Sequence, residues 1–200
     1  MSASLGRSVR VLALAWLASL ASACSALRQP PPPIRLLDRN TGITYRVVRR
    51  PIVFAHLHPQ AEAHARDYAT AVGTWIDQDG DLEYVLFVYL WSTVDPRDDP
   101  HRPRDAGAIT LIADDRLIRL TAKKVPASDA SDVPPSDRPP VRAYTVAEFR
   151  TDGETLRYLA AAGHIELVRG PPGERLRYSL WGDGRAALAG LIRAEGRGFP

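Results

Sequence analysis

The chain has 200 residues, 45% hydrophobic and 24% charged, which is the composition of one globular domain with short additional segments. Its formal net charge is +3, but residues 1–23 hold two arginines and no acid, so the remainder is nearly neutral. A nearly neutral chain without a block of Lys or Arg excludes nucleic acid from the partners we expect. The single cysteine excludes an internal disulfide framework.

Residues 1–23 have the three-part layout of a secretory signal peptide. A short positive segment is followed by an apolar run, and the last three residues are small. The apolar stretch from residue 11 to residue 23 is 13 residues long, whereas a helix that spans a bilayer needs roughly 20. We therefore expect a cleaved leader and no permanent transmembrane helix.

The end of this leader, Leu20-Ala21-Ser22-Ala23-Cys24, resembles the lipobox of bacterial lipoproteins, in which a small residue precedes a cysteine. Ala21 stands where the lipobox usually has Leu. The resemblance implies that Cys24 receives diacylglycerol, that the leader is cut before it and that its new amino group is acylated. Several acyl chains anchor a protein stably, because each buried CH₂ contributes roughly 0.8 kcal/mol.

Two further features bear on the location of the domain. Ser25 follows the cysteine in place of Asp, and by resemblance to Gram-negative lipoproteins this implies the outer membrane, with the domain facing the periplasm. The run of prolines within residues 24–33 favours extended polyproline II and predicts a stiff stalk. The alternative is secretion to the periplasm without an anchor, because residues 21–23 also form an A-x-A cleavage site.

The first part of the domain is predicted to be built from strands. Three short ones are expected at residues 34–37, 43–48 and 52–57. Pro51 cannot donate a hydrogen bond to a neighbouring strand, so an edge or a break is expected just before the third of them.

The clearest predicted element is a long hairpin. Its strands run over residues 64–76 and 82–93, and the turn between them contains Asp-Gly, a strong hairpin signal. Residues 82–93 are apolar on both faces and rich in β-branched and aromatic side chains. This pattern predicts a central strand that is covered on both sides.

Loops and a second hairpin follow. Residues 95–107 form a charged loop interrupted by prolines. The second hairpin pairs residues 108–113 with residues 117–122. Residues 126–140 are too polar and too rich in proline to be buried, so we predict a mobile loop there.

The last part of the chain is predicted to alternate strands with helices. Thr151 and Glu154 have the spacing of a capping box, in which each side chain satisfies the other's amide donor. Asp183 is predicted to cap the second helix. The predicted elements in order are a strand at 143–149, a helix from Thr151 to Gly163, a strand at 164–168, a turn at 169–173, a strand at 176–181 and a helix from Asp183 to Gly196.

These elements together predict a single α+β domain over residues 34–200. Its fold class is a largely antiparallel β-sheet with two C-terminal helices packed on one face.

Three histidines, His56, His58 and His64, form a candidate metal site. His56 and His58 are two residues apart, so on a strand both side chains point to the same face, and His64 follows within a short loop. Imidazole nitrogens are ligands for zinc and copper. The alternative is that they are exposed histidines at an edge or turn, because Glu62 is the only carboxylate near them in the sequence.

Other candidate motifs do not predict chemistry. Asp77, Asp79 and Asp81 have the spacing that begins a calcium loop, but its sixth and twelfth positions are Leu82 and Val88 instead of Gly and Glu. We interpret this segment as a turn. The sequence has neither Gly-x-Ser-x-Gly nor a Gly-rich phosphate loop, so we assign no catalytic residue and do not expect an enzyme.

Trp75, Trp91 and Trp181 fall within predicted strands, and we interpret them as core residues rather than a ligand platform. The leading hypothesis is a lipid-anchored binding or accessory module of the cell envelope. It would contact a protein partner through an exposed sheet edge or through its long loops. The alternative is a periplasmic protein that binds zinc or copper through the three histidines.

Overall fold

The computed structural model describes residues 32–57, 65–94, 107–123, 139–141, 144–170 and 173–194. All of them belong to one compact unit, Pro31–Pro200. The predicted leader, Cys24, and the histidines His58 and His64 lie outside the described residues, as does most of the loop predicted at residues 126–140. No helix among the described residues is long and apolar enough to cross a membrane.

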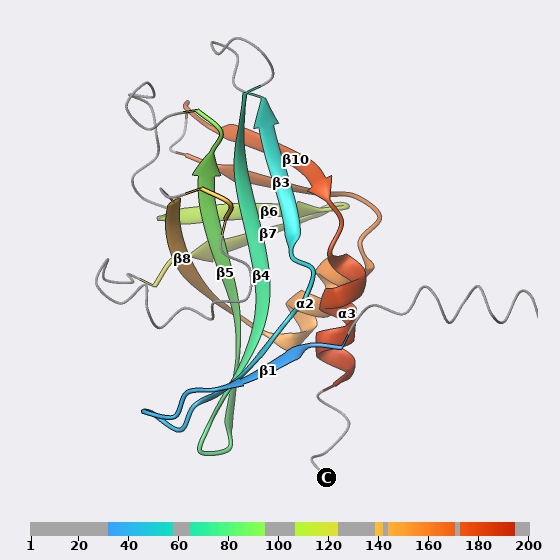
Figure 1. Ribbon diagram of the computed structural model, residues 1–200. Helices are drawn as coiled ribbons and strands as arrows, with labels where there is room; N and C mark the ends of the chain where they lie inside the picture. Colours follow the sequence, from blue (N-terminus) through green and yellow to red (C-terminus); the bar gives the residue numbers. More distant parts are fainter. Residues whose placement is uncertain are drawn as a thin grey trace, which may run out of the picture. The chain divides into compact units, whose positions relative to one another are not determined.

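The predicted long hairpin is confirmed and lies at the centre of the sheet (Figure 1). It consists of β4 (Arg66–Gln78) and β5 (Asp81–Ser92), joined by a turn in which Asp79 and Gly80 both have positive φ angles, 56° and 91°. Every residue from Ala69 to Trp75 is buried, and so is every residue from Tyr84 to Leu90. Consecutive burial means that both faces of this strand pair are covered.

Two short strands lie end to end along the other edge of β4. β2 (Thr44–Val47) pairs with its last residues and β3 (Ile52–Leu57) with its first ones. Between them the Val48 amide still donates to the Gly73 carbonyl at 3.1 Å, and Pro51 occupies the interruption. The break predicted at Pro51 is therefore confirmed. β1 (Ile34–Leu37) pairs with β2 and brings the chain into the domain.

The antiparallel sheet curls until its two end strands meet. Going across the sheet, the strands follow the order β8 (Tyr144–Thr151), β5, β4, β3, β10 (Leu176–Gly182), β9 (Ile165–Arg169), β6 (Ala108–Ala113) and β7 (Arg116–Thr121). Just beyond β7, the Lys123 amide donates to the Glu148 carbonyl of β8 at 2.8 Å. This contact makes the fold a curled, partly closed sheet.

The two helices, α2 (Gly153–Ala161) and α3 (Arg185–Arg193), pack on each other (Figure 1). α3 also lies against β4, where a Cβ atom on Gly73 would come within 2.6 Å of Leu188 Cδ1. The expected α+β arrangement is thus correct in its antiparallel sheet and two helices, but strands dominate the fold. Because the sheet curls, much of it is covered by other strands and not by a layer of helices.

The predicted capping box at α2 is wrong by one residue. Asp152 is the cap, because its carboxylate accepts from the Thr155 amide at 2.7 Å and from the Thr155 hydroxyl at 2.9 Å. Thr151 cannot take this role, since it is still the last residue of β8. Before α3, Asp183 does accept from the Arg185 amide at 3.0 Å, but the capping position itself is Gly184.

Candidate functional site

A row of aromatic side chains lies at the end of the sheet where β4 begins and β5 ends. Tyr68 and Trp91 face each other in register and stack, with ring centroids 4.2 Å apart. The Trp91 indole N–H donates to the Thr70 hydroxyl at 3.0 Å, which fixes the ring. The small Ala55 of β3 pairs with Tyr68 on one side and Ser179 on the other, so Tyr68 reaches Trp181 of β10 edge-on at 6.4 Å.

Two neighbours extend this row into an exposed surface. The Arg66 guanidinium lies 4.5 Å above the Trp181 ring, and Leu57 is the register partner of Arg66. Trp181 is 59% exposed and Leu57 54% exposed. Backbone and hydroxyl bonds between Arg66 and Thr93 hold the start of β4. We call Leu57, Arg66, Tyr68, Trp91 and Trp181 together the aromatic surface.

The interpretation of the tryptophans as core residues is confirmed for Trp75 and wrong for Trp181. Trp75 is 4% exposed, with Arg46 over its ring at 4.4 Å. Trp181 points outward because side chains alternate along β10, where Tyr178 is buried and Ser179 is exposed. The polar side chains on that face of β10 were the sequence signal that could have placed Trp181 at the surface.

A pocket open to solvent lies beside the aromatic surface and has polar and apolar lining residues. It is shallow, with an enclosed volume of about 10 Å³, roughly the space that one water molecule needs. Asp67 and Ser92 pair across β4 and β5, while Arg169 comes from the end of β9. Arg169 is only 7% exposed although it is charged. The complete lining is Asp67, Tyr68, Leu90, Trp91, Ser92, Arg169 and Tyr178.

Of the three histidines predicted to bind metal, the structure describes only His56. Its Nδ1 lies 2.7 Å from the Arg177 carbonyl, and its ring lies 5.4 Å from the Tyr178 ring. A carbonyl only accepts, so Nδ1 carries a proton in this contact. Within the part of the chain that the structure describes, no group of three His, Cys, Asp or Glu side chains could hold a metal ion.

The interpretation of residues 77–81 as a turn is confirmed. The Asp77 carboxylate accepts from the Gly80 amide at 3.1 Å, as expected of a turn. The hairpin ladder continues up to the pairing of Gln78 with Asp81.

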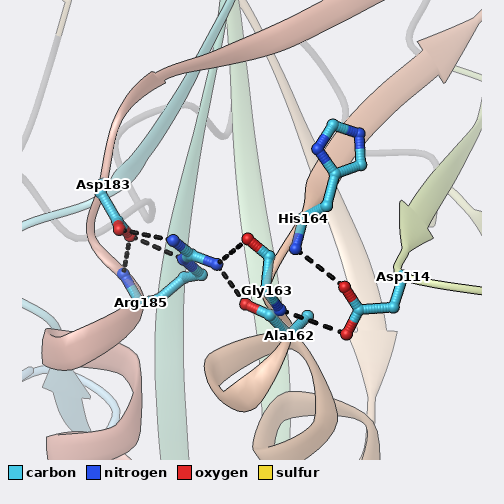
Figure 2. A network of polar contacts seen from close by, with 6 residues as sticks. All are labelled: Asp114, Ala162, Gly163, His164, Asp183 and Arg185. Carbon is cyan, nitrogen blue, oxygen red and sulfur yellow. Dashed lines mark hydrogen bonds and ion pairs between the residues drawn. The ribbon is translucent and has the colours of Figure 1, made fainter.

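A second polar network joins the turn between β6 and β7 to both helices (Figure 2). Arg185, the first residue of α3, donates to the carbonyls of Ala162 and Gly163 just past α2 and to the Asp183 carboxylate. Asp114 accepts from the amides of Gly163 at 3.2 Å and His164 at 2.8 Å. Both oxygens of Asp114 accept backbone amides, and Arg185 donates to two carbonyls and a carboxylate, so we interpret the network as a structural junction.

The carboxylates of the junction are held in their charged form. Hydrogen bonds from the His164 and Gly163 amides lower the pKa of Asp114, and the side-chain bond from Arg185 lowers that of Asp183. A folded-state pKa below the unfolded value stabilises the fold above the unfolded pKa, and that stabilisation is lost as the pH falls through the folded pKa. The junction therefore weakens only in acid, below the ordinary pKa of an aspartate.

Replacing Arg185 with Met should lower the free energy of unfolding by about 2–3 kcal/mol, because carbonyls at the end of α2 lose a charged donor. Urea denaturation of the chain starting at Ser25 measures the effect. Arg193→Met is the matched control, since Arg193 is the exposed last residue of the same helix. A loss of similar size in both variants would contradict the role of Arg185 in the junction.

No protein-family model, no curated protein and no solved structure matches the chain.

Proposed function

We propose that this chain is a cell-envelope lipoprotein, anchored through lipid on Cys24, whose folded domain is a binding or accessory module for an envelope protein partner. The observation that carries the proposal is the position of the chain's one cysteine, immediately after the small residues that end a secretory leader. The prolines that follow supply a stalk between the anchor and the domain. Ser25 favours the outer membrane, with the domain in the periplasm.

The path of the chain suggests which end of the domain binds. The chain enters at β1, whose neighbour β2 pairs with residues 74–77 of β4. The aromatic surface and the pocket lie at residues 66–68 of the same strand. Five residues of β4, residues 69–73, separate the two levels, a distance of roughly 20 Å at about 3.3 Å per residue. We infer that the end of the domain where the chain enters, and where α3 packs beside Gly73, is the anchored end. The opposite end, which carries the aromatic surface, would receive the partner.

The second candidate function is metal binding by His56, His58 and His64 in a periplasmic protein. The observation in its favour is the Nδ1 contact of His56 with the Arg177 carbonyl. Metal-binding histidines commonly donate their other ring N–H to such a group, which orients the free nitrogen toward zinc or copper. The geometry of His56 is compatible with this role, and His58 and His64 follow it in the sequence.

The mass of the mature protein, purified from membranes in detergent, tests both candidates. We expect a polypeptide that begins at Cys24 and carries the added mass of acyl chains. Cleavage at the A-x-A site would give the same first residue, so the acyl mass and not the cleavage position separates anchoring from secretion. A bare polypeptide would contradict the anchor. Stoichiometric zinc or copper in a native spectrum, lost in His56→Ala, would instead favour the second candidate.

A further inference from the structure

Arginines gather where the chain enters the domain. The Arg49 Nε atom donates to the Pro32 carbonyl at 3.0 Å, which places this guanidinium beside the first residue that the structure describes. After its leader the chain as a whole is nearly neutral, so the entry carries a local excess of positive charge. Residues 32–50 hold one acid, Asp38, and five arginines, namely Arg35, Arg39, Arg46, Arg49 and Arg50.

The segment that carries the last of these arginines runs along α3. At one end of the helix, the Arg46 guanidinium donates to the carbonyl of Ala194, just past the last turn, at 3.3 Å. At the other end, the Arg50 carbonyl lies against Gly184, which precedes the helix. No residue of α3 is acidic, so the helix adds no negative charge beside this segment.

Three exposed arginines at this end have no acidic partner. Arg49, Arg50 and Arg193 are exposed, and no carboxylate in the part of the chain that the structure describes pairs with them. Asp183, the acid just before α3, is held by Arg185 instead. Exposed guanidiniums without a neutralising acid attract an anionic surface that comes near. We call Arg49, Arg50 and Arg193 together the arginine surface.

The acids of the β4–β5 turn lie away from the entry. Val47 pairs with Ile34 of β1, where the chain enters the sheet. Thr44, at the opposite end of β2, pairs with Asp77 of β4. From Asp77 the hairpin continues away from the entry to its turn at residues 79–80. The charge is therefore divided along this hairpin, with the basic side chains toward the entry and the acidic ones toward the tip.

We propose that the arginine surface contacts the anionic phospholipid head groups of the membrane that holds the anchor. The inference rests on the proposed lipid on Cys24 and adds an electrostatic contact that orients the domain. Residues 24–31 connect the anchor to Pro32, and eight residues reach at most roughly 29 Å. The covalent path thus keeps the arginines beside Pro32 near the bilayer. Guanidinium groups also match phosphate through paired hydrogen bonds.

The expected strength suits orientation rather than attachment. Each Arg near an anionic bilayer strengthens binding about fivefold, and salt screens this attraction. Three arginines therefore do not hold the unlipidated domain at physiological ionic strength. They do bias the orientation of a domain that the anchor already keeps at high local concentration. The aromatic surface, at the other end of the domain, then faces away from the bilayer.

The experiment uses the mature chain carrying Cys24→Ser, which keeps the whole domain but receives no lipid. The chain is sedimented with vesicles that contain equal parts of phosphatidylglycerol and phosphatidylcholine, or phosphatidylcholine alone. We expect binding to the anionic vesicles at low ionic strength and none to the neutral vesicles. Raising the salt to physiological ionic strength should release the chain, because the attraction is electrostatic.

Arg49→Gln combined with Arg50→Gln should weaken binding to the anionic vesicles at least tenfold, since two charges of about fivefold each are lost. The matched control combines Arg175→Gln with Arg177→Gln, which removes the same charge from two other exposed arginines. The Arg177 carbonyl contacts His56, so this pair lies at the level of the aromatic surface. The control should change binding by less than about twofold.

Folding is checked by thermal unfolding, and both double variants should stay near the unaltered chain because the replaced side chains are exposed. If the Arg49 and Arg50 variant does not fold, Arg193→Gln alone tests the same surface, with an expected loss of about fivefold. The inference is overturned if the chain binds neither kind of vesicle, binds both equally, or loses as much binding in the control as in the test variant. The acyl mass on Cys24 tests the anchor separately, so failure of the anchor and failure of the arginine surface give different results.

Discussion

A chain carrying Cys24→Ser is expected to leave the membrane fraction completely and to be recovered as a soluble periplasmic protein. Serine cannot receive the diacylglycerol, so the several acyl chains that hold the domain to the bilayer are absent. The leader should still be removed, because Ala21, Ser22 and Ala23 also satisfy the ordinary A-x-A signal peptidase. Cell fractionation followed by detergent phase partitioning measures the change, and the mature chain should keep its length.

Ser25→Asp is the matched control for this change. It leaves Cys24 intact, so the protein should remain lipidated and in membranes. By resemblance to Gram-negative lipoproteins, it should move from the outer to the inner membrane. If Cys24→Ser stayed in the membrane fraction, attachment would have to come from another part of the chain. The lipoprotein hypothesis would then be wrong even if the leader were cut as expected.

Much of the fold could be predicted because its signals are local. Asp79 and Gly80 fix the turn of the long hairpin, and their position between two β-rich segments specifies how β4 and β5 pair. The consecutive apolar residues of β5 correctly indicated a strand covered on both faces. Pro51 marked the interruption between β2 and β3 because a proline removes a hydrogen-bond donor. Each of these inferences needs only neighbouring residues and backbone chemistry.

The features that define the candidate site depend on contacts between distant strands. The sequence predicts a turn at Arg169, because Gly170 and two prolines follow it, whereas its pairing with β6 and β10 keeps it in a strand and buries it. The period-2 pattern of Ile165, Leu167 and Arg169 was the available signal. Closure of the sheet through Lys123 and Glu148 has no local signal, since it joins residues 25 positions apart across a loop.

Replacing Gly184 with Ala should lower the free energy of unfolding by about 3 kcal/mol, the upper end of the usual cost of overpacking. Gly184 stands at the start of α3, pressed against the break between β2 and β3. A Cβ atom there would meet the carbonyl groups of Arg50 and Pro51 at distances closer than real Cβ contacts. These are backbone atoms, so no side-chain rotation can relieve the clash, and either α3 or the break must move.

Gly163→Ala separates this effect from the general consequences of replacing a glycine. Gly163 has a negative φ, and a Cβ there would make only an ordinary contact, 3.5 Å from the Asp114 carboxylate. Its amide is retained, so the bond to Asp114 survives, and the smaller freedom of the unfolded chain should make this variant neutral or slightly more stable. Thermal and urea unfolding should therefore show a lower free energy of unfolding for Gly184→Ala and an equal or slightly higher one for Gly163→Ala. Equal stability of the two would mean that α3 does not rest on the break at Pro51, and the packing of that helix against β4 would then have to differ as well.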